Sequence, residues 1–298
     1  MPGSWGARLF LSVFISVLRC LPYFLYRLLA APLVGAAYLF SGRLHRHALE
    51  SLSIAYGDHL SLSEKRRIAR ASFFNLTWGL VDVLYYTARP ASAAGRFEVE
   101  GSEHLKHAQE AGKGVVVVVA HVGPFAAMLF KFLCEGYRVN VVMRAPRSSV
   151  WRHELMAHPE LWTPRLIYST PLRECVASCF NVLKANEFLV MPIDQNYGGI
   201  GRVFVDFFGR KAATAAGPAG YAVKTGAALL TAFAEPLKGG RWRIVVEPML
   251  WDASLEERAA VRHLTQALTA RVEAQVRMYP KEWSWMHRRW KAVPRENE

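Results

Sequence analysis

The chain is poor in cysteine, and this shortage excludes several classes of site. Its 298 residues include four cysteines (Cys20, Cys134, Cys175 and Cys179), and no two of them form a C-x-x-C pair. The spacing matches no zinc or redox motif, and a chain of this length needs no disulfides to hold its core together. We therefore expect reduced thiols in a cytoplasmic domain and no metal site.

Acidic residues are also scarce, with 24 Asp and Glu against 37 Lys and Arg, which leaves a formal charge of +13. Such an excess attracts either nucleic acid or an anionic membrane surface. The sequence contains no recognised nucleic-acid-binding motif, so a membrane-tethered nucleic-acid binder is supported by charge alone. Apolar residues make up 52% of the chain, too many for a disordered protein. We expect a membrane partner and no nucleic acid.

No uninterrupted apolar run reaches the ~20 residues of a transmembrane helix. The N-terminal 9–40 segment is almost continuously apolar, but Arg19 and Arg27 divide it. Its two halves together can cross a bilayer or dip into it. A cleaved signal peptide is the main alternative, although no small-x-small cleavage site follows promptly. A buried helical hairpin of a soluble protein is the other.

Basic residues follow this apolar segment directly, at Arg43, His45, Arg46 and His47. Positive charge beside a membrane segment favours the cytoplasmic side. We therefore expect residues 1–42 to form an uncleaved membrane anchor and residues 43–298 to form one domain that faces the cytoplasm.

The remainder alternates between strand and helix patterns. Residues 114–120 form a valine run without polar alternation, which is typical of a strand covered on both faces. A capping box at 61–64 predicts a helix that runs to about residue 86, and another at 254–257 predicts a helix that ends at Pro280. Residues 103–111 predict a short helix. The other predicted strands are 97–100, 139–143, 166–168, 188–193, 203–207, 228–234 and 242–247. This order predicts an α/β fold with a mostly parallel central sheet flanked by helices.

His121 directly follows the valine run, and Gly123 and Pro124 then suit the first turn of a helix. Ligands of open α/β sheets bind outside the carboxyl ends of the strands. A histidine there can act as a general base, and the backbone amides of residues 123–126 could stabilise an oxyanion. A histidine that merely completes a strand-end turn fits the spacing equally well.

From about residue 21 to 291 the chain resembles the bacterial lipid A late acyltransferases, within the lysophospholipid acyltransferase superfamily. The resemblance lies in the order and spacing of several motifs. They are V-E-G-S-E-H-L (99–105), G-K-G-V (112–115), A-H-V-G (120–123), D-Q (194–195), V-F-V-D-F-F-G (203–209) with A-T (213–214) and G-P-A (217–219), and W-S-W-M-H-R-R-W-K (283–291).

The resemblance implies an O-acyltransferase of lipid A and lipopolysaccharide biosynthesis at the bacterial inner membrane. The donor would be a fatty acyl chain on acyl carrier protein, or on coenzyme A, and the acceptor a lipid or glycolipid hydroxyl. No metal or redox cofactor is implied. The family has a histidine followed, after four residues, by Asp or Glu. His121 and Gly123 match this motif, but Ala126 stands at the acidic position.

Three interpretations of Ala126 remain open at this stage. Another carboxylate could replace the missing acid, and Asp194 and Asp82 are the candidates. His121 could act alone on an activated thioester. Alternatively, the chain could be a catalytically degenerate protein that binds acyl lipids or serves as a scaffold.

Several further residues are candidates for substrate binding. Arg144 and Arg147 follow a predicted strand, and arginine forks suit phosphate or carboxylate groups. Gln195 follows Asp194, Arg210 lies in a basic apolar segment that could contact lipid or carrier protein, and Thr214 precedes a helix start. For each, a solvated loop or a packing role is the alternative. The tryptophan-rich tail could lie at the membrane interface or pack on the domain.

Overall fold

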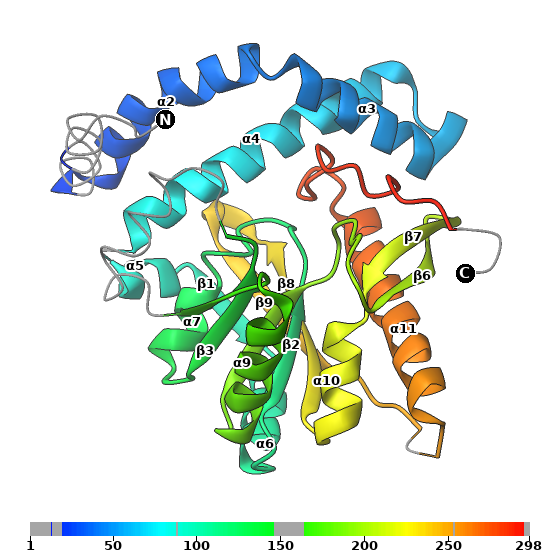
Figure 1. Cartoon of the computed structure of the whole chain (residues 1–298). Helices are drawn as coiled ribbons and strands as arrows, with labels where there is room; N and C mark the ends of the chain where they lie inside the picture. Colours follow the sequence, from blue (N-terminus) through cyan, green and yellow to red (C-terminus); the bar gives the residue numbers. More distant parts are fainter. Residues whose placement is uncertain (1–12, 14–19, 88, 146–163, 253, 295–298) are drawn as a thin grey trace.

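The computed structural model describes residues 13, 20–87, 89–145, 164–252 and 254–294, and its centre is a seven-stranded sheet (Figure 1). The strand order is β1-β9-β8-β2-β5-β3-β4, and every neighbouring pair is parallel except β8 with β9. The prediction of a mostly parallel α/β sheet is therefore confirmed. The strands are β1 (Phe97–Glu100), β2 (Val115–Val119), β3 (Val139–Met143), β4 (Arg165–Tyr168), β5 (Phe188–Pro192), β8 (Ala228–Pro236) and β9 (Trp242–Pro248).

Helices cover both faces of the sheet, and α4 crosses above it with α2 and α3 on its outer side (Figure 1). Alternate valines of β2 point to opposite faces and all five are buried, which explains the absence of polar alternation. The helices are α2 (Tyr23–Leu39), α3 (Gly42–Tyr56), α4 (Leu62–Tyr86), α5 (Pro90–Ala94), α6 (Ser102–Glu110), α7 (Leu129–Cys134), α9 (Leu172–Lys184), α10 (Gly217–Thr225) and α11 (Glu257–Met278).

The helix starts show where local sequence was sufficient and where it was not. Ser61 and Glu64 form the predicted capping box at the start of α4. The prediction at residues 254–257 was wrong, because Glu256 caps α11 by accepting a hydrogen bond from the Ala259 amide. The prediction of a helix directly after Pro124 was also wrong, because residues 125–128 form a turn and α7 begins at Leu129.

A second, two-stranded sheet packs beside α11. It consists of β6 (Arg202–Phe207) and β7 (Arg210–Ala215), which pair as an antiparallel hairpin. Only β6 was predicted from the sequence. The segment of β7 holds three alanines and two basic residues, and Thr214 is its one β-branched residue, so its pairing with β6 determines its conformation.

The N-terminal helices lie at one edge of the molecule. The first apolar run lies outside the described residues except for Val13. Among the described residues no single helix has the length and apolar character to cross a bilayer; only residues 23–39 and 42–59 together meet that measure, as a pair bent by 69°.

Candidate functional site

The site forms where two neighbouring strands end. β2 and β5 are parallel and in register, with Val119 opposite Pro192. His121 and Asp194 each lie two residues beyond these paired ends, so the strand register places them side by side. Two predicted catalytic residues, 73 positions apart in the sequence, are thereby brought into contact.

The Asp194 carboxylate is fully engaged by three donors. Its Oδ1 lies 2.8 Å from Nδ1 of His121, and its Oδ2 accepts hydrogen bonds from the His121 amide (2.9 Å) and from Nε1 of Trp283 (2.8 Å). The Asp194 side chain is 1% exposed and that of His121 is 19% exposed. A carboxylate buried in this way holds both the backbone and the ring of His121.

The two groups shift each other's pKa. Burial alone would lower the pKa of His121, but the charge and hydrogen bond of Asp194 outweigh it and raise that pKa above its usual value. Burial acts to raise the pKa of Asp194, but His121 and the Trp283 indole lower it to about 2. The carboxylate is therefore ionised at every physiological pH, and it stabilises the protonated imidazole.

The Asp194 contact also decides which nitrogen of His121 faces the cavity. Because the ionised carboxylate can only accept, Nδ1 carries the proton of the neutral imidazole, and Nε2 then has the lone pair. Gln195 points its Nε2 at this atom from 3.2 Å and can donate to it. An unprotonated Nε2 in a cavity wall is the form that a general base requires.

Gly123 has a structural role instead of the predicted substrate contact. Its N–H donates to the carbonyl of Glu282 at 2.9 Å and so is not available to a substrate oxyanion. Its φ is +56°, and a Cβ there would come within 2.8 Å of the Trp242 ring. The neighbouring Phe125 and Ala126 amides bond to no backbone carbonyl within the described residues, so they remain as candidate oxyanion donors.

A cavity of about 1410 Å³ opens at His121, larger than the roughly 300–1,000 Å³ of ordinary small-ligand pockets. Both Val141 and Val142 line it, although successive strand residues face opposite sides of a sheet. The cavity therefore extends over the carboxyl edge of the sheet and onto both of its faces. His121 lies where the cavity passes over this edge, a place that we call the crest.

Two arms descend from this crest on opposite faces of the sheet. The α4–α7 arm is apolar, and the α9–α10 arm is apolar near the sheet but lined by charged residues farther out. Residues of the α4–α7 arm are Leu80, Val83, Leu84, Ala126, Leu129, Phe130 and Val141; those of the α9–α10 arm are Val142, Cys175, Val176, Phe180, Gly217, Gly220, Tyr221, Lys224, Glu257, Arg258, Val261 and Arg262.

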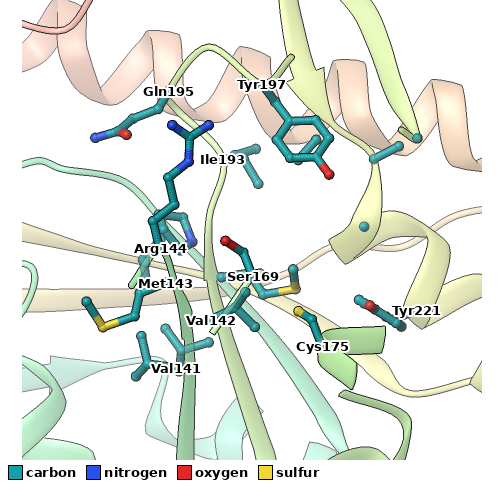
Figure 2. A pocket seen from close by; sticks show the side chains of 18 of the residues that line it. Val141, Val142, Met143, Arg144, Ser169, Cys175, Ile193, Gln195, Tyr197 and Tyr221 are labelled. Atoms are coloured by element: carbon teal, nitrogen blue, oxygen red, sulfur yellow. The ribbon is translucent and has the colours of Figure 1, made fainter. Parts of the chain in front are cut away.

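Arg144 and Gln195 line the cavity, above Cys175 and Tyr221 in the view of Figure 2. Two other predicted substrate-binding residues do not line it. Thr214 is fully buried and bonds to Arg289, and Arg210 is exposed at the turn of the β6–β7 hairpin. The hairpin thus turns both side chains away from the cavity. Thr214 cannot contact a substrate there, whereas contact of the exposed Arg210 with lipid or carrier protein stays a prediction. Arg147 lies outside the described residues.

Asp82, the other carboxylate considered for the catalytic pair, lies elsewhere. It accepts hydrogen bonds from Tyr23 (3.0 Å) and Arg27 (3.2 Å) and so connects α4 to α2. Burial raises the pKa of Asp82, although Arg27 and the Tyr23 hydroxyl act against that rise. Its role is to hold α2 on the domain.

The C-terminal segment 282–290 braces the site, a role that the sequence did not reveal. Besides the Trp283 bond to Asp194, the Ser284 amide donates to the His121 carbonyl (3.1 Å). Arg289 donates to the Gln195 carbonyl (3.1 Å), and the segment packs on the domain with Trp283 and Trp285 buried. The arrangement is a histidine–aspartate pair, rigidly held, at the crest of a large and mostly apolar cavity. Such a pair suits proton transfer from a hydroxyl during acyl transfer.

Comparisons with known proteins agree with this chemistry. The family model described as bacterial lipid A biosynthesis acyltransferase matches residues 1–292. The chain is 25% identical to the lipid A biosynthesis palmitoleoyltransferase of Escherichia coli (strain K12), over 92% of this chain and 87% of that protein. It is 25% identical to the lipid A biosynthesis lauroyltransferase of the same strain, over 98% of this chain and 94% of that protein. It is 30% identical to the phosphatidylinositol mannoside acyltransferase of Mycolicibacterium smegmatis, over 67% of this chain and 66% of that protein. The chain therefore belongs to the bacterial lipid A biosynthesis acyltransferase family, and it is an O-acyltransferase.

Proposed function

We propose that the protein transfers a fatty acyl chain from a thioester to a hydroxyl of a glycolipid, with His121 as the general base. The observation that carries this proposal is the buried contact between Asp194 and Nδ1 of His121. Asp194 supplies the carboxylate that the motif lacks at Ala126, so the substitution does not remove the orienting acid. This argues against a degenerate binding protein.

The proposed reaction proceeds in two steps. Nε2 of His121 takes the proton of the acceptor hydroxyl as its oxygen attacks the thioester carbonyl, and the negative charge on the tetrahedral oxygen is met by the amides of Phe125 and Ala126. The carbon–sulfur bond then breaks, and His121 returns the proton to the departing thiolate. The products are an ester and a free thiol. No metal or redox cofactor takes part, and the Asp194 charge stabilises the imidazolium that exists between the steps.

The donor in this proposal is an acyl chain on acyl carrier protein or on coenzyme A. The α4–α7 arm suits the hydrocarbon chain, since Leu80, Val83, Leu84, Leu129 and Phe130 line it without a charged residue. Burial of each methylene there contributes about 0.8 kcal/mol, so the depth of this arm would select the chain length.

The acceptor in this proposal is a glycolipid, because the names of the relatives refer to lipid A biosynthesis and to phosphatidylinositol mannoside, and both of these lipids are glycolipids. Arg144, at the crest beside Gln195, is the residue that would bind its acidic head group.

We place the protein at the bacterial inner membrane with its α/β domain in the cytoplasm. On α2, Phe24, Leu28 and Leu33 are 68%, 65% and 59% exposed, and the following Phe40 is 90% exposed. Exposed apolar side chains in such number mark an interaction surface. Arg43, near the start of α3, adds positive charge suited to anionic lipid.

The test is acyl transfer by membranes that contain the protein, with labelled acyl-carrier thioester and a bacterial lipid extract. Wild-type protein should produce labelled lipid, and His121→Ala should reduce the label to background. Equal activity of the two would contradict the role of His121. If neither transfers label, but both retain labelled acyl lipid, the binding-protein alternative replaces the enzyme.

A further inference from the structure

The outer end of the α9–α10 arm is positively charged. Lys224 of α10 and Arg258 and Arg262 of α11 line it, and all three side chains are exposed. Arg258 and Arg262 are four residues apart and so lie on one face of α11. Glu257 is the acidic residue of this wall and forms an ion pair with Lys224 at 3.3 Å. The two arginines outweigh it, so the mouth carries a net positive charge.

One face of α10 leads from this mouth toward the crest. Gly217, Gly220, Tyr221 and Lys224 line the arm at helical spacing, and seven residues of helix span about 10 Å. A Cβ added at Gly220 would meet no atom within 4 Å, so packing does not require a glycine there. Glycine inside a helix costs about 1 kcal/mol relative to alanine. The open space beside Gly220 is therefore available for a ligand to lie against the helix backbone.

The chemistry of this arm suits a soluble anionic thioester better than a lipid. The methyl end of a fatty chain gains nothing beside exposed cations, whereas a phosphate there makes charge-assisted hydrogen bonds. The arm also opens far from α2, the helix assigned to the membrane: the amino end of α11 lies at the opposite end of the molecule (Figure 1). A lipid acceptor and a soluble donor would then approach His121 from different sides.

We propose that the α9–α10 arm is the channel for the donor's phosphopantetheine thread, with the phosphate bound by Lys224, Arg258 and Arg262. This inference rests on the proposed function, because it assumes a thioester donor. The thread lies along Gly217 and Gly220, the thioester carbonyl reaches His121 at the crest, and the acyl chain continues into the α4–α7 arm. The same thread occurs in acyl carrier protein and in coenzyme A, so both donors share the channel.

The test is direct binding, which does not require turnover. The full chain in detergent is titrated with fluorescent acyl carrier protein and, separately, with fluorescent acyl-CoA. The double variant R258E/R262E should weaken both by at least tenfold. The control K106E/K184E makes the same change in net charge on exposed helix residues outside the cavity, and it should stay within twofold of wild type.

Gly220→Leu tests the channel without changing charge. Leucine favours helix and the space is open, so the melting temperature should not fall, whereas donor affinity should fall at least fivefold. Weakening of both donors by the charge reversal supports a phosphate site, and weakening of the carrier protein alone would overturn the channel in favour of a protein-docking patch. Unchanged affinity for both donors, or a rise only in the KM for the lipid acceptor, would also overturn it. Absence of acyl transfer by wild type, with donor binding intact, would instead refute the proposed function.

Discussion

Replacing Asp194 with asparagine is the sharpest test of the catalytic pair. The side chain is nearly isosteric, but it loses the charge and offers an N–H where His121 needs an acceptor. The ring can then turn to the tautomer that carries its proton on Nε2, which cannot act as a base. Exchanging the orienting aspartate of a catalytic triad for asparagine lowers kcat by about 10⁴-fold. Asp194→Asn should therefore lower kcat by about 10²–10⁴-fold, which corresponds to a rise of about 3–5 kcal/mol in the activation barrier at about 1.4 kcal/mol per decade.

The assay is kcat for acyl transfer at saturating donor, with the melting temperature measured in parallel as a function of pH. The folded-state pKa of Asp194 is about 2, below its ordinary 3.8, so its stabilisation is present above pH 3.8 and disappears as the pH falls toward 2. The pKa of His121 is raised, so its contribution is complete below 6.5 and disappears as the pH rises through the raised value. The stability deficit of Asp194→Asn should therefore be largest between about pH 4 and 6.5.

Asp82→Asn is the matched control, since it also neutralises a buried aspartate near the cavity. Its partners are Tyr23 and Arg27 of α2, so kcat in detergent should stay within about threefold of wild type. An Asp194→Asn enzyme that keeps more than a tenth of wild-type kcat would refute the pairing, and so would a loss in Asp82→Asn equal to that in Asp194→Asn.

Three further predictions concern the same site. The kcat/KM for the acceptor should rise with pH through a midpoint above 6.5, because His121 must be unprotonated and its pKa is raised; a pH profile with a lower midpoint would contradict this. Trp283→Phe removes one donor that holds the Asp194 carboxylate against the His121 ring, so kcat should fall about tenfold with KM unchanged, because small misplacements of a catalytic group are costly. The midpoint of the pH profile should move upward, since a carboxylate with one donor fewer attracts the imidazolium proton more strongly; a loss of kcat without this shift would indicate a packing role alone. Ala126→Glu should lower kcat about tenfold, since it places an unpaired carboxylate in an apolar arm; a gain in kcat would mean that Asp194 does not replace the missing acid.

Local sequence was sufficient to predict most of the sheet. The eight predicted strands are all present, and their bounds differ from the observed ones by at most two residues. Their β-branched composition and the turn residues that bound them act over a few positions, so a short stretch of sequence is enough to recognise them. The position of His121 was predictable for the same reason, because a strand end can be located without knowing the neighbours of the strand.

Features that depend on distant segments were not predictable in this way. β7 becomes a strand because β6 pairs with it, and Thr214 turns away from the cavity because Arg289, 75 residues later, bonds to it. The Trp283 indole at Asp194 belongs to the same class. The sequence motif marked residues 283–291 as important, but it contained no indication that they brace the carboxylate.

The sequence alone thus determined the fold class, the strand that carries His121 and the absence of an acid at Ala126. It named Asp194 as the catalytic partner of His121 and kept Asp82 as a second candidate for the missing acid, because local patterns do not specify which strands become neighbours. The tertiary structure decided between them through strand order. Hydrogen bonding of β5 beside β2 in register places Asp194 against the His121 ring, whereas the packing of α2 on α4 commits Asp82 to Arg27 and Tyr23.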